Sequence, residues 1–186
     1  PTAAADGPTR FNVFDTVDAA ALINDDNTVN LDGEGIEYVA EMSELATSQV
    51  SGPGFLLVSE GSGTANDLGR PINSPNLAVL TDAQGNIVGA QVFGEAELGP
   101  QLRYGFEGLA HDAGTGTLLI GVQRAWNDEV GARLVAIDTT SDDPAASGKF
   151  FYYTFDEPRS PAGGWIGIAD LHALGDDQFL VLERDN

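Results

Sequence analysis

The chain has 186 residues, with 29 acidic and 8 basic side chains and a formal net charge of −21 at pH 7. Its hydrophobic fraction of 42% is too high for a disordered acidic chain, and the absence of cysteine excludes a disulfide scaffold and a zinc–thiolate site. The strong negative charge argues against nucleic acid and anionic membranes as partners, and suits a divalent-cation binder, a salt-adapted secreted protein or simple solubility.

Strand-like runs dominate the chain, and helical periodicity is scarce. Two short helices are predicted, at Asp18–Ile23 and Glu41–Thr47. The strand runs are rich in Leu, Val, Ile, Phe and Tyr and are bounded by Gly, Asp, Asn or Pro. They cover Gly54–Ser59, Asn76–Thr81, Ile87–Phe93, Thr117–Gln123, Arg133–Asp138, Phe150–Phe155 and Gln178–Glu183. The sequence therefore predicts an all-β protein, with no apolar run long enough to span a membrane.

One unit occurs three times. Asp32–Glu37 resembles Gly105–Ala110, Trp165–Asp170 resembles both more weakly, and each is followed by an apolar strand. Positions 107 and 123 recur 60 residues later, at 167 and 183. A repeating unit of about four strands is typical of a β-propeller blade, and propellers have about four to eight blades.

We therefore expect residues 1–186 to be a partial β-propeller domain with units of roughly 30–100, 101–160 and 161–186 onward. About three four-stranded blades are present, so a partner chain or the remainder of a larger polypeptide would complete the ring. The chain begins at Pro1 without Met, which we interpret as a processed product or an excerpt.

The turns of the hairpins indicate which residues face each other. Residues equidistant from an antiparallel turn are cross-strand neighbours. With turns centred at 115 and 175, and an inserted excursion over Glu41–Pro53, the predicted pairs are Glu107 with Gln123, Gly167 with Glu183, and Glu34 with Glu60. Rotational symmetry would place all three pairs on one rim of the propeller.

Acidic side chains on that rim would suit a calcium site. Two facing carboxylates repel and need a cation or a proton between them, and Ca²⁺ accepts carboxylate, amide and carbonyl oxygens. The candidate ligands are Glu34, Glu60, Glu107, Gln123 and Glu183. The alternative is that these side chains cap strands and bind arginine or backbone N–H groups.

Parts of the chain resemble the phytase-like β-propeller family, described as having esterase-like activity of phytase. The stretches that carry the resemblance are Phe106–Asp112, Leu119–Arg124, Ala173–Asp185 and, at the opening blade, Asp32–Ile36. The similarity covers roughly residues 30–186. The chain is more distantly similar to calcium-dependent alkaline phytases, in which Glu-Gly is followed sixteen residues later by a second glutamate. Glu107 meets that spacing, but residue 123 is Gln, which removes a charge.

Three arginines are candidates for holding a substrate phosphate. Arg124 and Arg184 each follow a rim position, and Arg103 lies just upstream of Glu107. Arginine suits phosphate and carboxylate oxygens alike, so salt bridges to the rim glutamates or to Asp185 are the alternative.

The resemblance implies calcium-assisted hydrolysis of a phosphoester, such as a phosphorylated small molecule, by a secreted or periplasmic protein. Calcium would activate water and offset phosphate charge, and no side-chain nucleophile is required. The sequence has two histidines and no Gly-x-Ser-x-Gly elbow, which argues against a serine triad. The alternative is a non-catalytic extracellular module for binding or assembly, with structural calcium.

Overall fold

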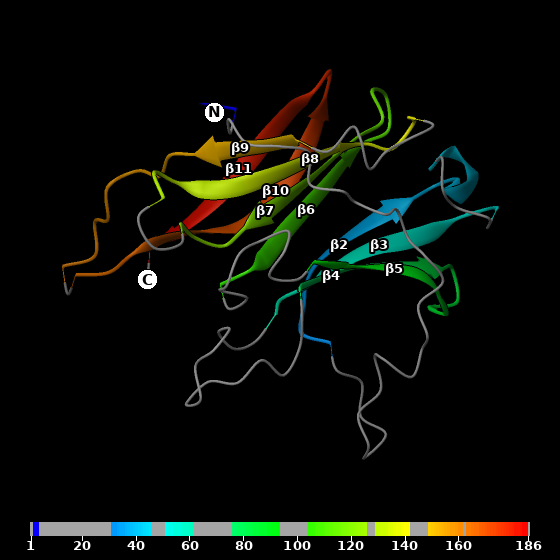
Figure 1. Ribbon diagram of the computed structural model, residues 1–186, viewed down its shortest axis with the longest axis horizontal. Coiled ribbons are helices and arrows are strands. Elements are labelled where there is room, and N and C mark those ends of the chain that lie inside the picture. The colour runs from blue at the N-terminus through cyan, green and yellow to red at the C-terminus, as the bar shows by residue number, and fades with distance from the viewer. Residues whose placement is uncertain are drawn as a thin grey trace, which may run out of the picture.

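The computed structural model describes residues 2–3, 31–45, 51–61, 76–93, 104–125, 129–141, 149–161 and 163–185 (Figure 1). The strands in these ranges are β1 (Thr2–Ala3), β2 (Gly33–Val39), β3 (Gly54–Ser59), β4 (Asn76–Asp82), β5 (Ile87–Phe93), β6 (Phe106–Asp112), β7 (Thr117–Val122), β8 (Ala132–Asp138), β9 (Lys149–Tyr153), β10 (Ile166–Gly175) and β11 (Gln178–Asp185). Among the described residues, no helix has the length and hydropathy needed to cross a membrane.

The strands form three antiparallel sheets, as Figure 1 shows. The first sheet has the order β2-β3-β4-β5, the second β1-β9-β8-β7-β6, and the third consists of β10 and β11. The all-β prediction is confirmed. The described residues form three sheets and no closed ring.

All seven predicted strands are present. Gly54–Ser59 and Ile87–Phe93 agree to the residue, and the other five agree within a few residues at their ends. Their apolar residues fill the sheet interfaces. In β4, for example, Ala78 and Leu80 are buried on one face, while Leu77 and Val79 are buried on the other.

The predicted helix over Glu41–Thr47 is wrong where the structure describes it. Only one 3-10 turn, η2 (Met42–Glu44), forms there, and the backbone is extended again at Leu45. The Glu41 carboxylate accepts hydrogen bonds from the backbone N–H groups of Ser43 and Gly52, which fixes a short turn and leads the chain into β3. The predicted helix at Asp18–Ile23 lies outside the described residues.

One edge strand from each of the three sheets packs directly on that of the next sheet. β6 contacts β2 on one side and β10 on the other. A Cβ atom at Gly35 would lie 3.2 Å from the backbone N of Leu109, and one at Gly108 would lie 2.9 Å from the backbone of Asp170. Glycine therefore allows the backbones of neighbouring sheets to approach closely.

Two hydrophobic clusters hold the sheets together. Between the first and second sheets, the core includes Leu56, Val58, Phe106, Leu118, Ile120 and Val135. Between the second and third sheets, it includes Ala110, Leu119, Leu134, Ile168 and Leu171.

The predicted cross-strand pairs are wrong by one or two residues. Glu60 and Gln123 pair with Asp32 and Gly105, two places before the predicted Glu34 and Glu107, and β2, β6 and β10 each contain a β-bulge. Glu34 is the extra residue between Gly33 and Gly35, and Glu107 is the extra residue between Phe106 and Gly108. In the third sheet the register shifts between Ile168 and Asp170. A bulge adds one unpaired residue to a strand, which symmetric counting from the turn cannot reveal. The observed partner of Gly167 is accordingly Arg184, while Glu183 pairs with Ile168.

Candidate functional site

The bulges define three equivalent positions in every sheet. The first position is two residues before the bulge, and the second is the bulge residue itself. The third position lies on the neighbouring strand and pairs with the first. In chain order the three sets are Asp32, Glu34 and Glu60; Gly105, Glu107 and Gln123; and Gly167, Ala169 and Arg184. The first set has three carboxylates, the second has one carboxylate and an amide, and the third has a guanidinium.

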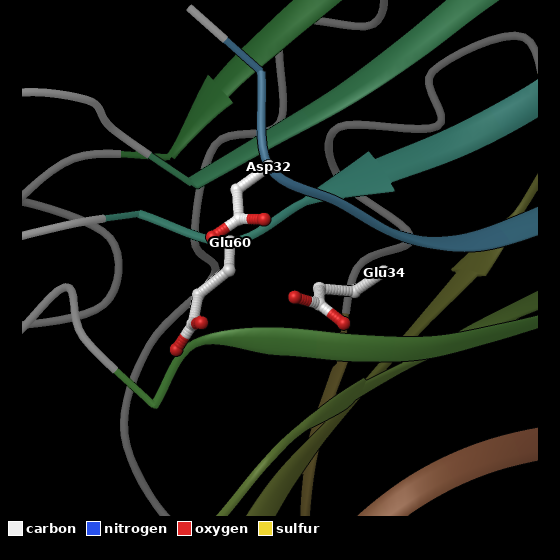
Figure 2. A group of neighbouring side chains, drawn as sticks. All are labelled: Asp32, Glu34 and Glu60. Carbon is white, nitrogen blue, oxygen red and sulfur yellow. The ribbon is translucent and has the colours of Figure 1, made fainter.

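The first set forms a compact group of carboxylates, here called the acidic triad. Asp32 precedes β2, Glu34 is the bulge residue of β2, and Glu60 follows β3 (Figure 2). One carboxylate oxygen from each residue lies within 4.8 Å of the other two. The backbone fixes this approach, because the N–H of Glu60 donates to the carbonyl of Asp32 at 2.8 Å.

Two members of the triad have raised pKa values. Burial is the main cause of the raised pKa of Glu60, and the backbone N–H of Gly105, which donates to Glu60 Oε1 at 3.1 Å, opposes it. Burial also raises the pKa of Glu34, with a further contribution from Asp32. Ionising these two carboxylates therefore costs more free energy than ionising exposed ones, and a bound cation would offset that cost.

Glu107 extends the acidic triad from the second sheet. Its side chain is 6% exposed, and its Oε1 accepts a hydrogen bond from Arg184 Nη2 at 3.2 Å. Burial raises the pKa of Glu107 to about 7, and Arg184 opposes this rise while Glu34 and Glu60 add to it. Glu107 can thus bind or release a proton near neutral pH.

Gln123 occupies the place of Glu60 in the second sheet. Its backbone N–H donates to Gly105 O at 2.6 Å, and its backbone carbonyl accepts from the N–H of Ile168 at 2.7 Å. The residue is 3% exposed, and its side-chain Oε1 has no hydrogen-bond partner among the described residues. A buried amide oxygen without a donor is uncommon and is an available ligand atom.

Arg124 and Arg184 lie against the same aromatic ring. The Arg124 guanidinium carbon is 4.7 Å from the ring centroid of Tyr104 and 4.8 Å from that of Trp165. Arg184 lies 5.6 Å from the Trp165 centroid, and the two rings meet edge to face at 5.7 Å. The aromatic pair therefore holds two guanidinium groups together, one of them in contact with Glu107.

The structure brings Glu34, Glu60 and Glu107 together, but it directs Glu183 elsewhere. Glu183 Oε1 accepts a hydrogen bond from the backbone N–H of Asp156 at 3.3 Å, and the side chain also hydrogen-bonds with Tyr153. Consecutive strand residues point to opposite faces, so the one-residue shift in register exchanges Glu183 for Arg184 at the site. Arg103 lies outside the described residues.

Sequence analysis missed Asp32 and the aromatic pair. Asp32 belongs to the repeated motif, but the residues aligned with it in the other copies are Gly105 and Trp165, so comparison of the copies gave it no weight. Tyr104 and Trp165 are separated by 61 positions in the chain and meet only because the second and third sheets pack together.

The donor set fits a hard divalent cation. Three carboxylates from Asp32, Glu34 and Glu60 supply oxygen ligands and a formal charge of −3, and no histidine belongs to the group. Such cations prefer carboxylate and amide oxygens, whereas zinc prefers nitrogen and sulfur. The acidic triad is therefore a candidate metal site.

Comparison with known proteins places the chain in a family. The family model "Phytase-like: Esterase-like activity of phytase" matches residues 3–186. The comparisons with curated proteins and with solved structures gave no match. Because the matched segment covers almost the whole chain, the protein belongs to the phytase-like family.

Proposed function

We propose that the chain is part of a β-propeller that hydrolyses phosphoesters with the help of calcium outside the cytoplasm. The observation that carries this proposal is the gradient of charge over the three equivalent positions, from the acidic triad through Glu107 and Gln123 to Arg184. Such a gradient places a site for a metal cation beside a site for an anion. Hydrolysis of a phosphoester with the help of a metal needs the first site for the metal and the second for the phosphate.

The propeller interpretation rests on the packing of the first strands. β2 packs on β6, and β6 packs on β10. Each of the three is an edge strand, and the other strands of its sheet extend away from it. The outer faces of the two end sheets expose large apolar side chains, such as Tyr38 (57%) on the first sheet and Leu182 (60%) on the third. Further blades packed in the same manner would cover these faces.

Asp32, Glu34 and Glu60 would hold the calcium ion, with Gln123 Oε1 as an additional oxygen donor. When bound, calcium supplies positive charge that acidifies water and offsets the charge of phosphate. Glu107, whose pKa burial raises to about 7 before a cation is bound, would exchange a proton with the leaving group or with water. Arg184 and Arg124 would orient the phosphate oxygens, because a guanidinium offers paired donors to them.

A second candidate function is a binding or assembly module in which calcium is structural. One contact favours it: Glu60 Oε1 accepts from the N–H of Gly105, so a triad ligand also joins the first sheet to the second. In that case, removing calcium would lower the melting temperature of the protein and would change no turnover.

A calcium titration with two chromogenic esters tests the proposal. The full chain is assayed with p-nitrophenyl phosphate and p-nitrophenyl acetate, in excess chelator and then with increasing calcium. We expect phosphatase activity that appears with calcium and is lost in chelator. Phosphatase activity that is unchanged in excess chelator would show that the metal has no role in catalysis. Hydrolysis of p-nitrophenyl acetate without hydrolysis of p-nitrophenyl phosphate would show that phosphoesters are not the substrates.

A further inference from the structure

A buried amide lies beside the candidate site, and the proposed function gives it no part. Asn76 is the first residue of β4 and is fully buried. Its Oδ1 accepts two hydrogen bonds, from the backbone N–H of Gly61 at 2.9 Å and from that of Phe106 at 3.0 Å. Because only the oxygen of an amide side chain can accept from N–H groups, these bonds fix the orientation of the amide.

The two donors flank two carboxylates of the site. Gly61 directly follows Glu60, and Phe106 directly precedes Glu107. One side-chain atom of β4 therefore joins the backbone next to a triad residue to the backbone next to Glu107. Since each carboxylate moves with the backbone beside it, Asn76 fixes the position of Glu107 relative to Glu60.

Gly105 makes room for this amide. A Cβ atom at Gly105 would overlap Asn76 Oδ1, so a larger residue cannot stand there while the amide keeps its place. Gly105 has in the second sheet the position that Asp32 has in the first. The amide therefore excludes a carboxylate from this position, and the second set cannot form another triad of acidic residues.

Alanine stands at the equivalent position of the second sheet. Continuing the observed pairing of β3 with β4 places Asn76 opposite Glu60, and continuing that of β7 with β8 places Ala132 opposite Gln123. Alanine has no side-chain acceptor. The repeat thus has the amide where three carboxylates meet and lacks it in the set with one carboxylate. This difference connects Asn76 with the site rather than with the general packing of one sheet on the next.

We infer that Asn76 is a positioning residue for the calcium site, because it holds the backbones of Glu60 and Glu107 at the separation that keeps Glu107 beside the acidic triad. This inference rests on the proposed function. Residues that orient metal ligands from outside commonly change metal affinity or activity by about tenfold or more when they are replaced. The effect of Asn76 would be transmitted through Glu60 and Glu107.

Calcium titration of Asn76 variants tests the inference. Asn76→Leu keeps the branching and the approximate size of the side chain but offers no acceptor, so the N–H groups of Gly61 and Phe106 lose this partner. Isothermal titration calorimetry on the full chain should show a calcium dissociation constant raised on the order of tenfold. Asn76→Asp keeps an acceptor oxygen and adds a negative charge, so it should bind calcium at least as tightly as the unchanged protein.

A smaller variant protects the test against misfolding. Asn76→Ala also removes the acceptor, but it leaves space for water at the two N–H groups. It should weaken calcium binding in the same direction, with the circular dichroism spectrum of the unchanged protein, and it replaces Asn76→Leu if that variant does not fold.

Steady-state kinetics separate positioning from a merely structural role. At saturating calcium, Asn76→Leu should lower kcat for p-nitrophenyl phosphate by about tenfold, because Glu107 is displaced from the triad. KM should change less than about twofold, because Arg124 and Arg184 are held against the ring of Trp165. Thr81→Val is the matched control, since it removes a buried hydroxyl near the other end of the same strand. It should leave the calcium dissociation constant and kcat unchanged.

Three results would overturn the inference in a protein that binds calcium. They are equal calcium affinity of Asn76→Leu and the unchanged protein, equally weak binding by Asn76→Leu and Asn76→Asp, and a lowered melting temperature of Asn76→Leu with unchanged affinity and kcat. In these cases the proposed function still stands. If the unchanged protein binds no calcium, the proposed function fails and the inference fails with it.

Discussion

Arg184 donates to Glu107 Oε1 across 3.2 Å, and it does so from the position that Glu60 occupies in the first sheet. A basic residue thus stands where the repeat first has a carboxylate. This exchange partly neutralises the group of carboxylates and leaves a guanidinium beside a candidate metal site.

Removing one negative charge from the acidic triad should weaken calcium binding. We expect Glu34→Gln and Glu60→Gln each to raise the calcium dissociation constant on the order of tenfold, because ligand charge sets calcium affinity. Glu157→Gln, which removes the same charge from an exposed residue, is the matched control. Isothermal titration calorimetry measures all three, and equal affinities would show that the triad holds no calcium.

Arg184→Ala should weaken the binding of the phosphoester and shift the pH profile. Arg184 lowers the pKa of Glu107, so its removal should move the corresponding pKa in the profile upward. Loss of a guanidinium contact to phosphate should raise KM by on the order of tenfold. Arg159→Ala, at an exposed position, should leave both quantities unchanged.

Without calcium, the protein should lose stability as the pH rises toward 8. The pKa of Glu107 is raised in the folded state from 4.5 to about 7. The folded state therefore holds this proton more tightly than the unfolded state, and the resulting stabilisation is complete below pH 4.5 and lost as the pH passes through about 7. The loss should amount to about 1–3 kcal/mol in the free energy of unfolding.

Denaturant unfolding at pH 5 and pH 8 measures this effect, and Glu107→Gln isolates it. The variant cannot lose a proton, so its stability should depend less on pH over the same range. If both proteins show the same dependence, Glu107 does not titrate near neutral pH.

Gly108→Ala should destabilise the packing of the second sheet on the third. A Cβ atom there would lie 2.9 Å from the backbone of Asp170, which cannot move without shifting β10. We expect a loss of about 1–3 kcal/mol in unfolding free energy. The control is Gly33→Ala, because a Cβ atom at Gly33 meets nothing within 4 Å and should cost less than about 0.5 kcal/mol. Similar melting temperatures for the two variants would contradict the close packing.

The sequence by itself determined the strands and the identity of several candidate residues. Apolar runs bounded by turn residues located β3 and β5 to the residue, because branched and aromatic side chains favour strands and glycine, aspartate, asparagine or proline favour the turns that end them. The repeated motif also indicated Glu34, Glu60 and Glu107, since a repeat places its polar strand ends on the same side of successive sheets.

Only the tertiary structure decided which of these side chains meet. The bulges at Glu34 and Glu107 shift the register by one residue, and in the third sheet that shift exchanges Glu183 for Arg184. Asp32 joins the site through the backbone pairing of Asp32 with Glu60. A strand can be recognised from the alternation of its apolar residues, but a single extra residue at a bulge changes that pattern too little to be recognised. Packing between sheets also brings together residues that are far apart in sequence. The register of the strands and the contacts between sheets were therefore known only from the folded chain.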